Sequence, residues 1–506
     1  MYGPVVAFAA VKPDPQSPVI VGAGQYLHRA ASLDDAASPA QLMAQAVRAA
    51  ALDAGLPSVP KTPNSMRVVS LLSWRYRDPA RFVAAELGIE PAETVLSAGG
   101  GNSPQMLVNV TAAQIQRGEL DLAVIVGGEA WRTRMRARRE GATLPWPKVP
   151  EDVSPRRSVG SELVMNHEVE TAVGIVQPVQ VYPMFETALR ASAGRTVDEH
   201  QAMLGELWSR FSHVAAANPA AWLRTPLTPE QVRTVGPENR MIGLPYPKYM
   251  NSNNDVDMAA ALIMCSVERA RALGIAPDRW VFPNAGADCH EHQYVSQRWD
   301  FTRTPAIELG GRSALELAGI GIDDVSVVDL YSCFPSAVQL GAQSLGLALD
   351  GQLTRTGGLP FAGGPWNNYV MHAIATVVAD LRERPGEWGL VWANGGYATK
   401  HSFGVYRTSP PAAGFRLGDP QADVDALPRR EFTGSVGEDA PVRIEAYTVM
   451  HSREGSPENA FAACLLSDGR RAWGTSADPH LVAAMCEGEW VGRTVTLAAD
   501  ATLRVD

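Results

Sequence analysis

The sequence predicts an α/β protein made of two similar halves, followed by a small all-β domain. Three observations support this fold class. Short apolar runs alternate with helix-like stretches over the first 130 residues, and the same alternation resumes after residue 251. A Pro/Gly-rich segment at 409–421 then precedes several short runs rich in β-branched residues. With 506 residues, 46% of them hydrophobic, the chain is long enough for a large core and two or three domains.

Composition narrows the classes of function. The formal net charge is −10 and no long basic run occurs, which argues against nucleic acid as a partner. No apolar run approaches the roughly 18 residues of a membrane span, and the first 15 residues lack a basic leader, so we expect a cytoplasmic protein. Five widely spaced cysteines do not form a disulfide framework, and we expect free thiols.

Residues 99–130 form the most informative stretch. A glycine turn is followed by Asn102, Ser103 and Pro104, which predict a helix start with Ser103 as the capping residue. Residues 121–126 then predict a strand that is covered on both faces. Gly101 is therefore expected just before a helix N-terminus, where the partial positive charge favours a thiolate or an oxyanion. A nucleophile is expected in such a place, and the sequence has glycine there.

The remaining elements of the first half predict a largely parallel sheet with helices on its faces. We expect strands at 19–25, 67–74 and 93–97 and a helix at 38–55. The pair Gly22-x-Gly24 lacks the third glycine of a dinucleotide-binding turn, so it does not predict such a site. Residues 131–250 interrupt the alternation and predict an inserted loop domain with a helix at 197–218.

The second half repeats the pattern. The second half of residues 251–266 predicts a buried strand, or a strand leading into a helix. Strands are expected again at 280–283, 325–330 and 389–392, with helices at 304–318, 335–345 and 366–381. The expected organisation is an N-terminal half at 1–266, which includes the loop domain at about 131–250, and a C-terminal half at 267–410. A linker at 411–429 and a β domain at 430–506 follow.

The C-terminal domain has five predicted strands with a single helix at 478–486 between the third and the fourth. That order is typical of a small OB-like barrel. Any other small all-β module remains an alternative.

Four motifs together resemble the thiolase superfamily, and most of all the sterol-carrier-protein-type thiolase-like proteins. They are residues 99–130, NSNNDVDMAAALIM at 251–264, VVDLYSCFPSA at 327–337 and AGGPWNN at 362–368. The resemblance implies a duplicated fold of two βαβαβαββ halves in αβαβα layers, with a loop domain inserted in the first half. It also implies a site for coenzyme A or an acyl-CoA as ligand where the halves meet, without a covalently bound cofactor.

The motifs depart from the family at the positions that carry its chemistry. Gly101 stands in place of the acylated cysteine, Gly364 in place of the histidine of Gly-His-Pro, and Ala393 in place of the cysteine of Cys-x-Gly. Covalent acyl transfer needs an activated nucleophile and donors aimed at the developing oxyanion. We therefore expect no acetyl-CoA acetyltransferase activity by the usual mechanism.

Other side chains are candidates for altered chemistry. Tyr331 stands where the family has Asn or His, and His401 lies in a predicted loop near the last motif, so both are candidate acid/base residues. A tyrosine packed with a satisfied hydroxyl is the alternative for Tyr331. Further residues expected to line the pocket are Ser103, Ser332, Cys333, Asn367 and Asn394, with Cys333 expected mainly as a packing residue.

Two charged clusters are further candidates for ligand sites. A set of basic residues in the inserted domain suits the phosphates of coenzyme A, while a solvated charged face is the alternative; these residues are Arg132, Arg134, Arg136, Lys148 and Arg156. The run at 288–292, Asp-Cys-His-Glu-His, has ligand-like spacing. It falls in a predicted loop where thiolases hold no metal, and we expect none.

Three hypotheses for function follow. The first is an enzyme of acyl-CoA or lipid metabolism with altered carbon–carbon bond chemistry of the retro-aldol type; thiolase-like aldolases that lack the cysteine and use a separate OB-fold partner resemble this pattern. The second is a non-catalytic acyl-CoA or lipid binder. The third is a scaffold whose OB-like domain contacts another protein. The sequence leaves both a homodimer and a monomer open.

Overall fold

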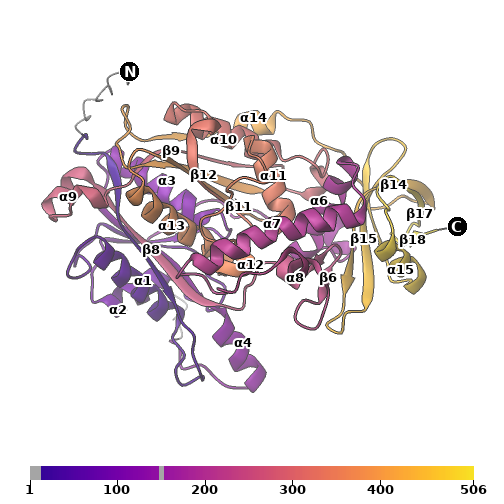
Figure 1. Cartoon of the computed structure of the whole chain (residues 1–506), viewed down its shortest axis with the longest axis horizontal. Coiled ribbons are helices and arrows are strands. Elements are labelled where there is room, and N and C mark those ends of the chain that lie inside the picture. Colours follow the sequence, from indigo (N-terminus) through magenta and orange to yellow (C-terminus); the bar gives the residue numbers. More distant parts are fainter. Residues whose placement is uncertain (1–12, 148–152, 506) are drawn as a thin grey trace.

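A computed structural model describes residues 13–147 and 153–505 and shows three β-sheets with helices packed around them (Figure 1). The first sheet has the strand order β1-β8-β4-β2-β3-β5, in which β8 runs antiparallel to both of its neighbours. Its elements are β1 (Pro18–Leu27), α1 (Pro39–Asp53), β2 (Ser65–Val68), α2 (Pro79–Leu87), β3 (Glu93–Ser97), α3 (Ser103–Gln116), β4 (Leu122–Ala130), β5 (Arg157–Val159) and β8 (Asp257–Ser266).

The second sheet has the order β10-β11-β12-β9-β13. After α9 (Val267–Ala272), its elements are β9 (Phe282–His290), α10 (Pro305–Ala318), β10 (Val325–Leu330), α11 (Pro335–Leu345), α12 (Leu359–Ala362), α13 (Tyr369–Glu383), β11 (Trp388–Gly395), β12 (Lys400–Arg407) and β13 (Arg416–Gly418). The first-half order β2-β4-β8-β1 recurs as β10-β11-β12-β9, so the predicted duplication is confirmed. The described residues of this half contain no strand beyond β10 that would correspond to β3.

The helices and the two sheets together form five layers, as predicted. Helices α3 and α13 lie between the sheets and contact strands of both, whereas α1 and α2 cover the outer face of the first sheet and α10 and α11 that of the second. Most side chains of α3 are buried, polar ones included. Gln105 accepts a hydrogen bond from Tyr406 and Asn109 donates one to Asp288, which makes a central polar helix tolerable.

Two segments predicted as loops are strands. Asp288 and the following two residues belong to β9, and His401 lies in β12, where β12 pairs with both β9 and β11. Both segments mix polar and apolar residues and carry histidines, which hid their alternation. Tertiary pairing on both sides overrides that weak local signal.

The inserted region is mainly helical. It contains α4 (Trp131–Glu140), α5 (Glu168–Ala172), α6 (Pro178–Ser192), α7 (Val197–Ala217), α8 (Pro229–Arg233), β6 (Met241–Gly243) and β7 (Tyr246–Pro247). The predicted helix at 197–218 is confirmed by α7, which begins with a capping box between Thr196 and Glu199. Among the described residues, no helix is long and apolar enough to cross a membrane.

The C-terminal domain is all-β apart from one helix, as predicted. It contains β14 (Ala440–His451), β15 (Pro457–Leu465), β16 (Arg471–Ser476), α15 (Pro479–Glu487), β17 (Thr494–Leu497) and β18 (Leu503–Arg504). The order β16-β15-β14-β17-β18 is antiparallel, and a parallel bridge from Thr475 to Thr502 brings the last segment back to β16. Asp478 caps α15, as expected. The assignment to the OB fold itself stays a prediction.

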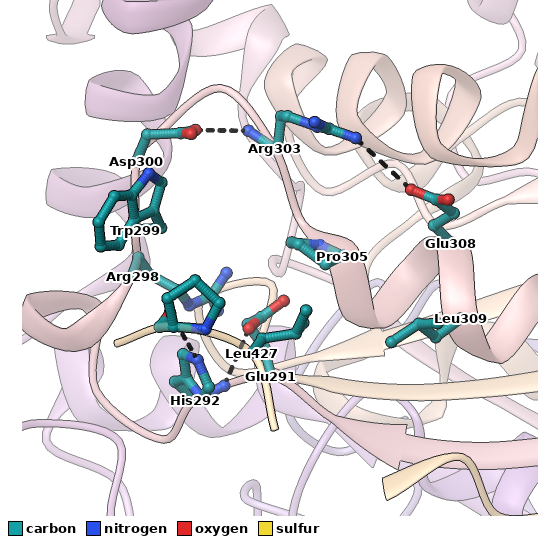
Figure 2. Close-up of a pocket in the computed structure, with 11 residues that line it drawn as sticks. Glu291, His292, Arg298, Trp299, Asp300, Arg303, Pro305, Glu308, Leu309 and Leu427 are labelled. Carbon is teal, nitrogen blue, oxygen red and sulfur yellow. Dashed lines mark hydrogen bonds and ion pairs between the residues drawn. The ribbon is translucent and has the colours of Figure 1, made fainter. Parts of the chain in front are cut away.

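The C-terminal domain is docked on the rest of the chain rather than tethered to it. The segment at 411–429 contains β13 and a short helix, α14 (Gln421–Asp425). Arg471 is fully buried, pairs with Glu445 at 2.8 Å, and donates to the carbonyl oxygens of Val295, Ser296 and Arg298. These carbonyls belong to the loop between β9 and α10, which borders the cavity drawn in Figure 2.

Removal of Arg471 is expected to weaken this docking strongly. Arg471→Ala leaves the largely buried Glu445 without its cation and three carbonyls without a donor, so the free energy of unfolding should fall by about 3–5 kcal/mol. The matched control is Arg470→Ala, which removes an exposed ion pair with Asp468 and should leave stability unchanged. Urea unfolding monitored by circular dichroism compares the two; equal effects would contradict the assigned role of Arg471.

Candidate functional site

The site centres on the turn that leads into α3. The helix starts at Ser103, but the Ser103 hydroxyl donates to the carbonyl of Ala98 at 2.7 Å and Asn102 occupies the N-cap without a side-chain cap. The prediction that Ser103 caps the helix is therefore wrong. The helix start is buried, so the hydroxyl anchors the turn to the preceding strand instead.

Residues from distant parts of the chain hold the turn. The backbone N–H of Gly99 donates to Glu162 at 2.8 Å and that of Gly100 donates to Asn367 at 3.1 Å. The ammonium group of Lys400 donates to the carbonyl of Gly99. A Cβ atom on Gly100 would lie 2.8 Å from the Cε of Lys400, and Gly100 has a φ of 144°, so only glycine fits here.

Gly101 has no room for a side chain. A Cβ atom at this position would collide with the hydroxyl group of Tyr331 and with the carbonyl oxygen of Asn394. Both partners come from the second half, from the end of β10 and from β11. The volume in which a nucleophilic side chain would begin is thus occupied by Tyr331.

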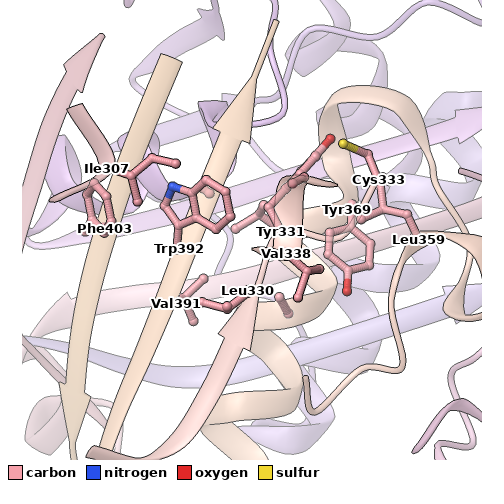
Figure 3. Packing of buried hydrophobic residues seen from close by; sticks show 14 of the residues in the cluster. Ile307, Leu330, Tyr331, Cys333, Val338, Leu359, Tyr369, Val391, Trp392 and Phe403 are labelled. Carbon is pink, nitrogen blue, oxygen red and sulfur yellow. The ribbon is translucent and has the colours of Figure 1, made fainter. Parts of the chain in front are cut away.

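Tyr331 is buried directly after β10, where its backbone N–H donates to the carbonyl of Trp392 at 3.1 Å. Its ring meets that of Tyr369 edge to face, with centroids 5.7 Å apart (Figure 3). Burial, followed by the proximity of Cys333 and Tyr369, raises the pKa of Tyr331 well above its ordinary value. The hydroxyl is therefore neutral at physiological pH and can act as a hydrogen-bond donor.

Ser332 and Cys333 are buried beside Tyr331. Burial raises the pKa of the Cys333 thiol to about 12, so this thiol stays protonated and is a poor nucleophile. The Ser332 Oγ lies 3.1 Å from where a Cβ on Gly358 would stand, in close contact with the α12 region. Cys333 packs in the buried hydrophobic core.

Asn394 and Ala393 lie on β11 with opposite orientations. The Asn394 side chain donates to the hydroxyl of Tyr182 on α6 at 2.9 Å, and the same hydroxyl accepts from the backbone N–H of Ala398. Ala393 is fully buried and supplies no polar group. The inserted domain thus supports this end of β11 through Tyr182.

In the third motif, at 362–368, the space for a side chain on the glycine is also occupied. A Cβ on Gly364 would collide with the Oγ of Ser252, which comes from the NSNND segment. Asn367 donates to the carbonyl of Ser70 at 2.9 Å and accepts from Gly100, so it connects this motif to the turn before α3. The structure therefore brings Gly101, Asn367, Tyr331 and Asn394 together.

His401 lies on the other side of the second sheet. Successive strand residues point to opposite faces, and Lys400 reaches the turn before α3, so His401 points away from it. Its Nδ1 accepts from the indole of Trp392 at 3.3 Å, and burial lowers its pKa to about 3. The imidazole is neutral and does not face Tyr331.

An open cavity of about 390 Å³ reaches the start of α3, and its lining includes Asn102, Ser103, Met106, Asp288 and Lys400. Burial raises the pKa of Asp288 to about 6 and lowers that of Lys400. Sequence reasoning missed Lys400, whose only signal was a lysine at the start of an alternating apolar strand. A volume of this size is typical of a small-molecule site.

The basic residues of the inserted region are only partly grouped. Arg132, Arg134 and Arg136 share α4, where they bond respectively to Asp255 at 2.8 Å, to the carbonyl of Leu72 at 2.6 Å and to Glu140 at 2.8 Å. Arg156 donates instead to the carbonyl of Ala92, just before β3. Lys148 lies outside the described residues. In the described part of the chain no cluster of three or more His, Cys, Asp or Glu could hold a metal ion.

Family models match the second part of the chain. One, described as "Thiolase C-terminal domain-like", matches residues 287–408. Another, described as "Thiolase-like protein type 1 additional C-terminal domain", matches residues 419–502.

Known proteins are similar over longer spans. A monomeric SCP2-thiolase like protein type 1 from Mycobacterium smegmatis is 33% identical, with a TM-score of 0.82, and the match covers 98% of this chain and 100% of that one. An Ltp2–ChsH2(DUF35) aldolase has a TM-score of 0.58 at 21% identity, over 78% and 98% of the two chains, which shows the fold alone.

Benzoylsuccinyl-CoA thiolase subunit BbsB of Thauera aromatica is 24% identical over 270 residues, 53% of this chain, and the match spans only 60% of that curated relative. The identity and coverage of the mycobacterial structure, together with both family models, show the family. The chain belongs to the thiolase superfamily, as an SCP2-thiolase-like protein of type 1 with the additional C-terminal domain.

Proposed function

We propose that the chain binds coenzyme A thioesters and does not transfer acyl groups by the thiolase mechanism. The observation that carries this proposal is the contact at Gly101, where the Tyr331 hydroxyl and the Asn394 carbonyl occupy the nucleophile's place. Gly364 and Ala393 supply no side-chain donor or base at the two other family positions. An acyl-enzyme requires a nucleophile that this arrangement lacks.

Binding is supported by different features. The open cavity at the start of α3 lies near the helix N-terminus, whose partial positive charge suits a thioester oxygen. Arg132, Arg134 and Arg136 provide guanidinium groups on α4 for phosphates, although each also bonds to the protein. The curated relative is by its name a benzoylsuccinyl-CoA thiolase, which supports a CoA thioester as the ligand class.

A second candidate is retro-aldol cleavage of a 3-hydroxyacyl-CoA. In this reaction a base removes the proton of the 3-hydroxyl, the bond between the second and third carbons breaks, and an enolate of the thioester leaves with a carbonyl product. The neutral Tyr331 hydroxyl at the head of α3 suits donation to the enolate oxygen.

We also propose that the chain acts as a monomer. Strand β5 pairs in parallel with β3 and covers the edge of the first sheet, which otherwise would be free to pair with a second copy. The mycobacterial relative is described as monomeric.

We expect the chain to bind coenzyme A thioesters without catalysing thiolysis. Calorimetry should show saturable binding of coenzyme A and acetyl-CoA to the purified chain. Under the same conditions acetoacetyl-CoA should persist in the presence of coenzyme A, because no nucleophile can accept the acyl group. A clear coenzyme-A-dependent loss of acetoacetyl-CoA would overturn the proposal, and absence of any binding would favour the scaffold.

Restoring the family cysteine should destabilise the fold. Gly101→Cys forces the new side chain against Tyr331 and Asn394, and overpacking of this kind costs about 1–3 kcal/mol of unfolding free energy. Gly99→Ala is the matched control, because its Cβ would stand at an ordinary 3.5 Å from Glu162. Denaturant unfolding gives both values; a stable Gly101→Cys variant would refute the crowding at this position.

Removal of the Tyr331 hydroxyl group tests the role of this residue. If a 3-hydroxyacyl-CoA is cleaved, Tyr331→Phe should lower kcat by about 10²–10³, the loss typical of one donor to an oxyanion. The ring stays in place, so coenzyme A binding should be retained. Unchanged turnover in the phenylalanine variant would remove Tyr331 from the mechanism.

A further inference from the structure

Arg298 is a buried cation with unused donors. It is 2% exposed and lies after the short turn that follows β9. Its Nη2 donates to the carbonyl oxygens of Tyr397 and Ala398 at 2.9 and 2.6 Å. Its Nε and Nη1 are buried without a hydrogen-bond partner in the described part of the chain. A guanidinium in a protein stays protonated, so this charge cannot be relieved by proton loss.

Other buried arginines of the chain have a carboxylate partner, which Arg298 lacks. Arg67 lies 3.5 Å from Glu93, Arg190 lies 2.5 Å from Glu489 and Arg471 lies 2.8 Å from Glu445. No such ion pair is found for Arg298 among residues 13–147 and 153–505, although the charges of Glu291 and Glu170 act on it through space. Buried donors without a hydrogen-bond partner are costly, which favours an external anion as the partner of Nε and Nη1.

A cavity of about 280 Å³ adjoins this guanidinium (Figure 2). Its walls come from the loop after β9, the start of α10, and the tail segment at Leu427 and Pro428. Glu291 borders the same cavity, but its two oxygens accept from the backbone N–H groups of His292 and Ala306, each at 3.1 Å. This carboxylate therefore serves the N-terminus of α10.

His292 supplies a hydrogen-bond acceptor. It is 3% exposed, and its Nε2 lies 3.3 Å from the carbonyl oxygen of Pro428. A carbonyl oxygen only accepts, so Nε2 carries the proton and Nδ1 is an acceptor. That Nδ1 is buried and has no partner among the described residues. Arg298 and His292 both line the cavity, so unpartnered donors and an unpartnered acceptor lie within its wall.

We propose that this cavity binds a small organic hydroxycarboxylate, with its carboxylate on Arg298 and its hydroxyl donating to His292 Nδ1. The rim carries the carboxylates of Glu291, Asp300 and Glu308, and among the lining residues Arg303 is the second arginine, 3.6 Å from Glu308. Such a rim disfavours a dianion and favours a monoanion. The site is separate from Tyr331 and α3 and does not depend on the proposed function.

The location couples this site to the C-terminal domain. Arg471 of β16 donates to the carbonyl of Arg298 at 2.6 Å, and Leu427 and Pro428 precede that domain in the chain. A bound anion on Arg298 is therefore expected to stabilise the docked domain and raise the thermal midpoint.

The test is calorimetry of the full chain with three probes. 3-Hydroxybutyrate should bind, butyrate should bind at least several-fold more weakly because it lacks the donor for His292, and inorganic phosphate should bind most weakly. Arg298→Gln should abolish binding of 3-hydroxybutyrate. Leu427→Trp fills the cavity while keeping the arginine and should abolish binding too, even if the first variant folds poorly.

Arg312→Gln is the matched control, because this arginine pairs with Glu308 outside the cavity and its loss should leave the affinity within about twofold. Coenzyme A binding, measured in parallel, should be unchanged in Leu427→Trp, which separates this site from the one at α3. No binding of 3-hydroxybutyrate, tightest binding of phosphate, or undiminished binding in Leu427→Trp would each overturn the proposal.

Discussion

The close approach of the two halves at Gly101 is the constraint on which the site depends. The hydroxyl of Tyr331 and the carbonyl of Asn394 lie where a side chain would start, and a Cβ on Gly395 would in turn stand 2.8 Å from Asn102. Backbone therefore packs on backbone at the head of α3. This contact seats the central helix between the sheets, and it fills the volume that a catalytic thiol would need.

Much of the fold could be predicted from the chain because strong local patterns agreed with the tertiary structure. The strand at 93–97 and the helix at 197–218 matched to within one residue, and the single helix of the C-terminal domain was found by its Asp478 cap. The prediction failed where tertiary pairing decided the conformation. His401 lies in β12, whose mixed composition resembles a loop but which pairs on both sides.

The sequence predicted which residues form the site better than it predicted how they are arranged. Motif positions identified Gly101, Tyr331, Asn367 and Asn394, and the structure brings them together. The Tyr331 hydroxyl fills the nucleophile's place because the two halves approach each other closely there. No local sequence pattern encodes that approach. The same holds for Lys400, which reaches Gly99 across the interface between the sheets.

We propose that no acyl-enzyme forms on this chain, and intact-protein mass spectrometry tests this most directly. The protein would be incubated with acetyl-CoA or acetoacetyl-CoA, quenched in acid and weighed, with peptide mapping of any adduct. The crowding at Gly101 and the protonated thiol of Cys333 predict an unmodified mass. A stoichiometric acetyl adduct on Cys333, Tyr331 or another residue of this site would contradict the account.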